Sequence, residues 1–546
     1  MNRTICVAVL SLMAIPQTHA QTSQPRYLRG MLVIVGESKE SKQPVRNTKV
    51  FVRNVGSAIT TDTGEFRIQL PTAFRSGRLV TLAIEKPGFV IHYPLSGEFR
   101  LPDDELDEIE IRILPEGSKL LWTDQRIERF IEQTAEEASG ELRPASVARG
   151  DLAKYVLAFG LEYGFTEEEV HTALQEWAEK AKENATDFRQ VGLAAFAEGR
   201  LDVAAPSLRK AGMDTINDGL KDIEDDSIAN GVGEEKVADG IDDVVLGGDA
   251  YFMGNQYNDA IETYYLALKY VDQKTDRARW RRIKFRIGNA ASNLGERVDA
   301  EESVKILHQA IESYREASEQ TERLANATHW ADINHNLGLA LTSLANRTGG
   351  EEARDLYAEA RKVLLEALKI NTQERLPTRW ANSQIALGNV LQELGKRADG
   401  SQVSQLLTEA VEAYENALQV QSRVEHAESW ANTQSNLGNA LSLKGQLTGG
   451  QEGLDLLFEA EHAIQEALSV RTDATQWARA KLNLAIVKAA MGRMISGKYS
   501  KRLLLGSLVA CQDATRSFTL AEYPQQWARA SAHFGQFRLA RQVSIG

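Results

Sequence analysis

Six tryptophans recur through the C-terminal part of this 546-residue sequence, and their spacing restricts the fold more than any other feature. The series is Trp280, Trp330, Trp380, Trp430, Trp477 and Trp527, and its first four members are spaced by 50 residues. A Leu-Gly-like pair follows each tryptophan after seven or eight residues, as in Leu337-Gly338. So long a period, shared by all copies, predicts a tandem-repeat fold in which each unit stacks on its neighbours.

A second pattern runs in the same period and predicts the second helix of each unit. It reads Ala-x-x-x-bulky-x-x-Ala, as in Ala310, Tyr314 and Ala317. Offsets of four and seven place all three residues on one helical face, and small alanines let two helices approach closely. Each 50-residue unit is therefore expected to be a helical hairpin.

These residues resemble the tetratricopeptide repeat, in a long form with about ten extra residues between the first-helix glycine and the second-helix alanine. Two units upstream of Trp280 fit the ordinary short form, one of them through Gly248 and Tyr264. The resemblance implies an all-α superhelical solenoid over residues 187–546. Because the six tryptophans keep a constant place in the pattern, we expect them to belong to the repeat core rather than to a ligand site.

Counted from each tryptophan, offsets 2, 6 and 9 fall on the helix face opposite offsets 0, 7 and 11. That face carries Arg282, Arg286, Asn289, Asn336, Asn382, Asn389, Asn432, Asn436, Asn439, Arg479 and Asn483. In the tetratricopeptide family the first helices line a groove, where such side chains hold an extended peptide or its terminal carboxylate. A protein or peptide partner is therefore predicted here, although the same amides could instead bridge neighbouring repeats.

Residues 27–115 have the pattern of a small all-β sandwich that precedes the solenoid. Short apolar runs, such as Lys49–Val52 and Glu65–Leu70, are separated by turn residues. A tight hairpin is predicted at Thr61–Gly64, and Phe51, Phe66 and Phe89 are expected to face the core. The order of these motifs resembles the carboxypeptidase regulatory-like, transthyretin-like family, which implies an accessory module without catalytic residues.

The first 20 residues read as a cleavable signal peptide. Arg3 precedes an apolar run from Ile5 to Ile15, and Thr18-His19-Ala20 forms a small-residue cleavage site. The mature protein would then be exported, periplasmic or secreted, and would keep Cys511 alone, without a disulfide. The apolar run is too short for membrane insertion, and a net charge of -13 argues against nucleic acid as a partner.

Two segments between the sandwich and the long repeats have a less specific pattern. Residues 116–186 are expected to form a helical linker region. Residues 214–249 hold twelve acidic residues against Lys221 and Lys236, which favours a solvated or mobile acidic surface.

The sequence contains no motif that supports catalysis or a cofactor. A metal site at His329, Asp332 and His335 lacks an evident fourth ligand, and no nucleophile motif occurs. Three functions therefore remain: a non-enzymatic binding scaffold, an envelope assembly component that forms homo-oligomers through its repeats, or an enzyme within residues 116–249. The scaffold is the prediction that the repeats favour.

Overall fold

The computed structural model describes most of the β domain and of the helical repeats. The described residues are 26–35, 42–53, 55–71, 74, 78–93, 98–101, 108–116, 131, 135, 187–224, 231–319, 327–424, 426–471, 473–517 and 531–532. The predicted signal peptide, nearly all of the predicted helical linker and the last tryptophan motif at Trp527 lie outside them. These three predictions therefore stay predictions.

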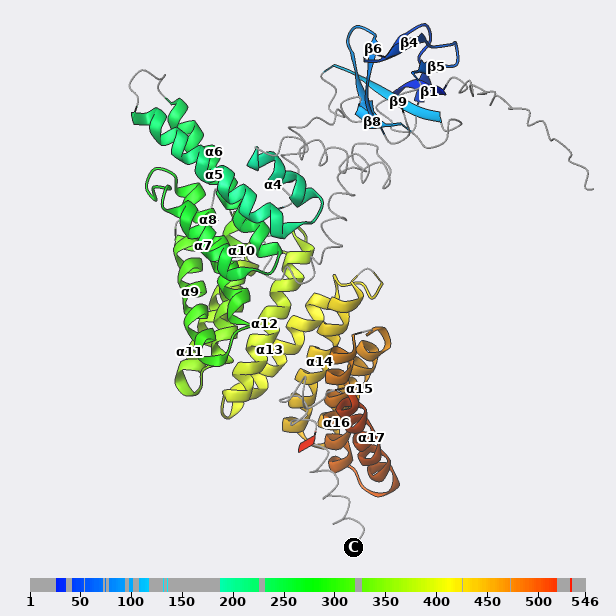
Figure 1. The fold of residues 1–546 in the computed structure, drawn as a ribbon. Coiled ribbons are helices and arrows are strands. Elements are labelled where there is room, and N and C mark those ends of the chain that lie inside the picture. Colours follow the sequence, from blue (N-terminus) through cyan, green and yellow to red (C-terminus); the bar gives the residue numbers. More distant parts are fainter. Residues whose placement is uncertain are drawn as a thin grey trace, which may run out of the picture. The chain divides into compact units, whose positions relative to one another are not determined.

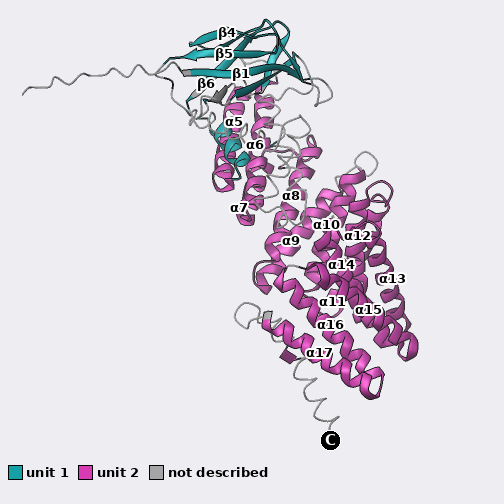
Figure 2. Cartoon of the chain, turned by 90° about the vertical axis from the view of Figure 1, so that its right-hand side faces the viewer, with its two compact units in different colours: residues 1–134, 149–199 teal, residues 135–148, 200–546 magenta. Residues whose placement is uncertain are grey.

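Contacts within the chain define two compact units (Figure 2). One holds residues 1–134 and 149–199, and the other holds residues 135–148 and 200–546. Residues 187–199 are grouped with the first unit, so the start of the solenoid at residue 187 also stays a prediction. Within the described ranges, no helix combines the length and the apolar character needed to cross a membrane.

The β domain consists of two packed sheets, which confirms the predicted sandwich (Figure 1). Its described strands are β1 (Arg26–Val35), β2 (Lys42–Pro44), β3 (Lys49–Val52), β4 (Gly56–Ile59), β5 (Glu65–Leu70), β6 (Leu79–Glu85), β7 (Phe89–Tyr93), β8 (Glu98–Arg100) and β9 (Glu108–Pro115). The first sheet has the order β2-β1-β9-β7, with β5 also paired to β1, and the second has the order β4-β3-β6-β8. β1 and β9 pair in parallel, so the ends of the domain sequence meet in one sheet.

Alternating side chains fill the space between the sheets. Phe66, Ile68 and Leu70 of β5 are buried, as are Val50 and Val52 of β3. Phe51 stands between those two valines and is only half-buried, because successive residues of a strand point to opposite faces. The prediction that Phe51 belongs to the core is therefore wrong, whereas the prediction for Phe66 is confirmed. Phe89 packs against the same core and is partly buried.

The turn at Thr61–Gly64 forms, but it does not close a hairpin. Gly64 has a φ of 81°, and its amide donates to the carbonyl oxygen of Thr61 over 3.0 Å. However, β4 before the turn pairs with β3, and β5 after it pairs with β1. The turn therefore carries the chain from one sheet to the other, a choice that depends on strand pairing and not on the turn residues.

Fourteen helices follow within the described residues. They are α4 (Phe188–Ala197), α5 (Leu201–Glu224), α6 (Val232–Met253), α7 (Tyr257–Leu268), α8 (Arg277–Gly295), α9 (Ala300–Glu319), α10 (Ala327–Ala345), α11 (Gly350–Leu368), α12 (Pro377–Arg397), α13 (Ser401–Leu418), α14 (Ala427–Thr448), α15 (Gly450–Val470), α16 (Ala474–Met494) and α17 (Gly497–Ser517). From α5 onward each helix packs against the next one in the chain. The fold is thus a β-sandwich followed by an all-α, tetratricopeptide-like solenoid, as predicted.

The repeat glycines allow the two helices of each long unit to pack closely. An added Cβ on Gly288 of α8 would lie 2.6 Å from the Tyr314 ring of α9, and one on Gly388 of α12 would lie 2.7 Å from the Tyr414 ring of α13. Gly248 of α6 faces Tyr264 of α7 in the same way, at 2.4 Å. In the two long units the glycine and the tyrosine are 26 residues apart, and in the short unit they are 16 residues apart. The long unit therefore contains ten additional residues and keeps the same contact.

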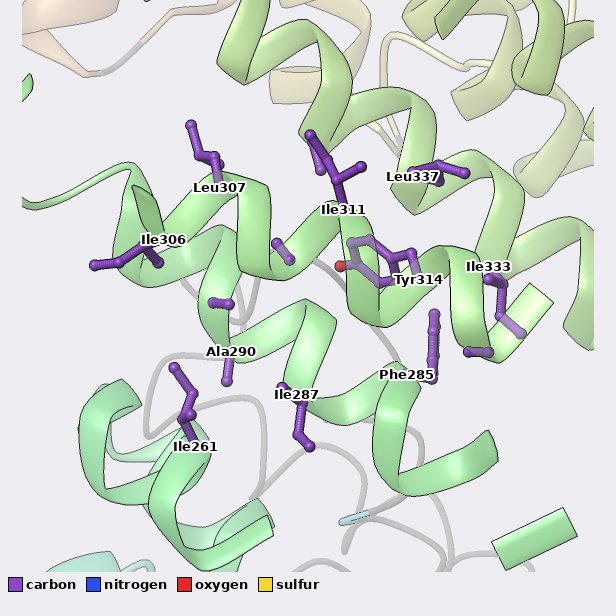
Figure 3. Packing of buried hydrophobic residues seen from close by; sticks show 14 of the residues in the cluster. Ile261, Phe285, Ile287, Ala290, Ile306, Leu307, Ile311, Tyr314, Ile333 and Leu337 are labelled. Atoms are coloured by element: carbon purple, nitrogen blue, oxygen red, sulfur yellow. The ribbon is translucent and has the colours of Figure 1, made fainter. Parts of the chain in front are cut away.

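A continuous core links these pairs. Ile261 of α7, Ile287 of α8 and Tyr314 of α9 belong to one buried cluster that reaches Val390 of α12 (Figure 3). A second cluster extends through α13, α15 and α16 to Met491. Since each unit buries its apolar face against its neighbours, no single unit can be stable alone.

The described residues of the acidic segment 214–249 lie in α5 and α6, apart from Gly231, which caps the start of α6. The two helices run antiparallel along a seam of glycines. A Cβ on Gly212 would lie 2.4 Å from the Gly240 carbonyl oxygen, and one on Gly219 would lie 2.7 Å from that of Gly233. Most acidic side chains outside this seam are exposed, but Asp243 and Asp249 are buried. The segment is therefore a solvated surface along its outer half and part of the core at its base.

Candidate interaction surface on the first helices

The predicted polar face divides into a buried part and an accessible part. Five of its eleven residues belong to buried or half-buried hydrogen-bonded groups that join neighbouring repeats around a tyrosine, and these are Arg286, Asn289, Asn336, Asn389 and Asn436. The first three are buried, and the last two are half-buried. These five residues therefore bridge neighbouring repeats, which is the alternative that the sequence left open.

The bridging residues form a recurring triad of one tyrosine and two amides. The Tyr314 hydroxyl donates to the side-chain oxygen of Asn289 over 2.7 Å, and the Asn336 amide donates to the same oxygen over 3.0 Å. The next full triad repeats this pattern one hundred residues later. There Tyr414 and Asn436 both donate to Asn389, over 2.8 and 3.1 Å. One amide oxygen thus joins the second helix of its own unit to the first helix of the next unit.

A charged version of the triad joins the short unit to the first long unit. Asp249 takes the place of the central asparagine and accepts from the Tyr264 hydroxyl over 2.6 Å. Arg286 donates to both Asp249 oxygens, over 2.8 and 3.1 Å, and both side chains are almost fully buried. Because a buried charge is costly without a hydrogen-bonded partner, these residues depend on one another.

One unit replaces the whole triad by apolar side chains. At the corresponding positions it carries Leu339, Leu364 and Ala386, and Leu364 packs on Gly338 as the tyrosines pack on their glycines. All three positions change together in this unit. The unit of Trp430 instead keeps the two amides, Asn439 and Asn483, with Ile464 in place of the tyrosine, and both amides are half-buried. An isolated buried donor or acceptor would lose its bonds to water without replacement.

Burial determines the protonation state of the triad tyrosines. It raises the pKa of Tyr264, Tyr314 and Tyr414 well above the ordinary tyrosine value, because a buried phenolate would lose its hydration. These hydroxyls therefore remain protonated donors at physiological pH, as the hydrogen bonds require.

The accessible part of the face lies mainly on the later first helices. Asn382 of α12 and Arg479 of α16 are exposed, and Asn432, Asn439 and Asn483 are half-buried. Arg282 of α8 is also half-buried, and it donates to Asp242 of α6 over 2.9 Å. The polar surface that a partner could reach is therefore centred on α12, α14 and α16.

Arg471, which the sequence analysis did not select, lies beside this accessible surface. One of its terminal nitrogens donates to the Ala431 carbonyl oxygen and to the side chains of Asn432 and Ser435, over 3.0 to 3.2 Å. The other donates to Gln476 over 2.5 Å, and the Nε atom is buried without a hydrogen-bond partner. Arg471 thus links the end of α15 to the first helices α14 and α16.

The charge of Arg471 has no paired carboxylate among the described residues. Burial lowers its pKa; the negative charges of Glu428 and Asp473 oppose this, and the positive charge of Arg479 adds a smaller effect in the direction of burial. A pattern in the sequence could have indicated this site: Asn371, Gln421 and Arg471 recur every 50 residues after the second helices. All three are polar side chains at the same repeat position, and Asn371 and Gln421 are buried.

The repeat tryptophans have a structural place that varies along the chain. Trp280 and Trp430 are buried, and Trp430 packs against Leu418, Ala467 and Val470. Trp330, Trp380 and Trp477 are half-buried. A lysine lies over the ring of Trp280 and another over that of Trp477, so part of each ring contacts a cationic side chain and not the core.

The residues considered for a metal do not assemble into a ligand set. His335 pairs with Ser383 over 3.1 Å, His329 packs edge-on against Phe285, and Asp332 lies 3.4 Å from Arg379. Across the residues that the structure describes, no group of three His, Cys, Asp or Glu side chains could hold a metal ion. Burial raises the pKa of Asp332 to about 6, since the partly exposed Arg379 offsets only part of the lost hydration.

No protein-family model and no curated protein matches this sequence. Among solved structures, the apo form of RapI is 14% identical and aligns 56% of this chain with 98% of its own, at a TM-score of 0.30. NprR in complex with its cognate peptide NprX is 14% identical over 61% of this chain and 83% of its own, at 0.29. Yeast Tom70 is 12% identical over 78% and 100%, at 0.21. At these scores any function has to be argued from the side chains of this chain.

Proposed function

We propose that this protein is an exported, non-enzymatic scaffold that holds a protein or an extended peptide along the first helices α12, α14 and α16. The observation that carries this proposal is the set of polar side chains that stays accessible there, after the bridging triads have used the others. These are Asn382, Asn432, Asn439, Arg479 and Asn483. Each amide can both donate to and accept from a peptide main chain.

The proposed partner carries a carboxylate near the α14–α16 end of the surface. Arg471 has no ion pair with a described carboxylate and donates to neutral side chains, and the exposed Arg479 adds a second positive charge in its surroundings. An acidic side chain or a terminal carboxylate at this end of the surface would accept charge-assisted hydrogen bonds from such guanidinium groups. Asn432, already bonded to Arg471, would orient the guanidinium.

The remaining parts of the chain have supporting roles in this proposal. The β domain is an accessory module of the carboxypeptidase regulatory-like type, and the first 20 residues direct export to the periplasm or beyond. No nucleic acid, membrane insertion, cofactor or catalytic residue belongs to the proposal. Its competitors are an enzyme within residues 116–249 and an assembly component.

Affinity capture with the mature chain tests the proposal. A first variant carries Asn382→Glu, Asn439→Glu and Arg479→Glu on the accessible surface. A matched control carries three glutamates on the exposed faces of second helices, at His308, Lys362 and His462. All three proteins should have equal helix content by circular dichroism.

We expect the wild type and the control to capture the same protein from an envelope extract, and the first variant to lose it. Peptides from the captured protein that contain an acidic residue should then bind the wild type. Equal capture by all three proteins would refute the first-helix surface. A catalytic activity that survives these substitutions and depends on residues 116–249 would favour the enzyme instead.

A further inference from the structure

The last described helix, α17, exposes two large apolar residues on its outer face, whereas each of the corresponding helices α9, α11, α13 and α15 has at most one large apolar residue at these positions. The alignment rests on a shared contact: Gly492 faces Leu504 as Gly395 faces Leu407 and Gly295 faces Leu307. The equivalent residue is Tyr357 in α11 and Leu457 in α15. The residues one and five positions later are His308 and Glu312 in α9, Ala358 and Lys362 in α11, Thr408 and Glu412 in α13, and Phe458 and His462 in α15, of which Phe458 is 50% exposed. In α17 they are Leu505 and Val509, which are 49% and 57% exposed, and the nearby Tyr499 is 62% exposed.

The same helix is basic, unlike the chain as a whole. It contains Lys498, Lys501, Arg502 and Arg516 against Asp513 alone, in a protein of net charge -13. Lys498, Lys501 and Arg502 are exposed and surround Tyr499 in the sequence. Exposed apolar residues bordered by one sign of charge are typical of a protein interaction surface.

The outer half of the α5/α6 hairpin has the complementary character. Leu220, Ile223 and Val232 are exposed there, although most large apolar side chains of the solenoid are buried. The described residues 217–224 and 231–239 hold six carboxylates against Lys221 and Lys236. Both lysines are already bound, to Asp218 and Asp222, which leaves Glu224, Glu234 and Glu235 exposed for other cations.

The two surfaces belong to opposite ends of one stack of helices. From α5 to α17 the helix contacts run from each helix to its neighbours in the chain, so α7 to α16 separate the hairpin from α17. A second copy of the chain can therefore offer its α17 face to the hairpin of the first copy, or its hairpin to the α17 face of the first copy. From this complementarity we infer that the α5/α6 hairpin of one copy docks on the outer face of α17 of another copy.

Such an interface is heterologous, because different surfaces of the two copies meet, and it leaves one free surface at each end of the pair. Association therefore continues beyond a dimer as the concentration rises. The charged residues around the apolar contacts make the association weaken with salt. This inference does not depend on the partner proposed for the first helices, and it involves none of those residues.

The test is a charge swap, read by analytical ultracentrifugation of the mature chain over a concentration series. A tail variant carries Lys498→Glu, Lys501→Glu and Arg502→Glu, and a tip variant carries Glu224→Lys, Glu234→Lys and Glu235→Lys. We expect the wild type to associate, with a dissociation constant that rises at least about tenfold between low and high salt. Each variant alone should be monomeric, because its two surfaces then carry the same sign of charge.

An equimolar mixture of the tip and tail variants should associate again. The basic hairpin of the tip variant then meets the acidic α17 of the tail variant, so the two charges are again opposite. Leu505→Ser with Val509→Ser should weaken association while leaving its salt dependence unchanged. A wild type that stays monomeric at low salt would overturn the inference. So would a mixture that fails to recover, which would indicate that residues 518–546 or another protein cover α17.

Discussion

The α5/α6 hairpin and the long repeats both depend on glycine, but the glycines meet different atoms. In the hairpin, Gly212 and Gly240 face the backbone of the opposite helix. At the Leu-Gly positions of the long repeats, Gly288 and Gly388 face a tyrosine ring, and Gly438 faces the side chain of Ile464 before any backbone atom. Gly445 and Gly453, which face each other's backbone in α14 and α15, are an exception within the long repeats. A backbone carbonyl cannot move without its helix, whereas a side chain can rotate. The hairpin should therefore tolerate much less change than the repeats, even though both present the same residue type.

The largest effect is expected where the two regions join, at the Asp249–Arg286 pair. Asp249→Ala removes the carboxylate that both Tyr264 and Arg286 donate to, and leaves a buried guanidinium without it. We expect a loss of about 3–5 kcal/mol in the free energy of unfolding. Urea unfolding followed by circular dichroism measures this loss. Asp239→Ala, at an exposed site on the same helix, is the control, and an equal effect of both changes would contradict the assigned role.

Replacing one glycine by alanine in each region compares the two kinds of glycine contact directly. In Gly240→Ala the new Cβ would lie 2.6 Å from the Gly212 carbonyl oxygen, so the helices must separate. We expect a loss of about 2–3 kcal/mol from overpacking. In Gly388→Ala the Tyr414 ring can shift, and the better helix propensity of alanine, about 1 kcal/mol, offsets most of the strain. Hydrogen exchange should report opening in α5 and α6 only for the first variant. Equal losses would show that the two regions do not differ in this respect.

The polar triads can be converted into the apolar one that the protein already contains. Asn389→Leu alone leaves the Tyr414 hydroxyl and the Asn436 amide without their shared acceptor, and we expect it to cost about 2 kcal/mol. Adding Tyr414→Leu and Asn436→Ala reproduces Leu339, Leu364 and Ala386, and should recover at least half of that loss. Thermal unfolding of the single and triple variants checks this. A triple variant less stable than the single variant would show that the triad has another role.

The smallest effect concerns two carboxyl groups, one in each region, whose pKa values shift in opposite directions. A hydrogen bond from Lys221 lowers the pKa of Asp218 in the hairpin, whereas burial raises that of Asp332 in the repeats to about 6. A carboxyl group that binds its proton more tightly in the folded state makes folding less favourable as pH rises from about 4 to 6. The contribution of Asp332 should be no more than about 1 kcal/mol, because the group is partly exposed. Stability measured at pH 4.5 and 7.5 should show this decrease in the wild type and a smaller one in Asp332→Asn.

Much of the solenoid could be predicted because the same residue pattern occurs in every repeat, so each copy supports the assignment of the others. The tryptophan period and the Gly–Tyr contact recur often enough to establish the helical hairpins and their ten additional residues. The glycine contact between α5 and α6 could also have been predicted. Glycines recur every seven residues in each helix, at Gly212 and Gly219 in α5 and at Gly233, Gly240 and Gly247 in α6. The acidic composition of that segment concealed a pattern that a search for short periods would have found.

The polar face was harder to predict because its period alone does not distinguish bridging from exposed residues. Offsets 6 and 9 point toward the neighbouring first helix in some units, where Asn289 and Asn336 become buried. The equivalent residues near the C-terminal end, such as Asn439 and Asn483, remain accessible. A tyrosine at the matching second-helix position separates these cases, since Tyr314 and Tyr414 supply the second donor and Ile464 does not.

The sequence alone determined the two fold classes, the order of the domains and the helical hairpin as the repeating unit. These follow from periodicity, which is a local property that side-chain spacing imposes on a helix or a strand. The tertiary structure alone decided which strands the Thr61–Gly64 turn connects, which asparagines bridge repeats, and that Arg471 lies beside the accessible surface. Each of these depends on which segments far apart in the chain come together, and that pairing results from packing the whole solenoid or sandwich at once.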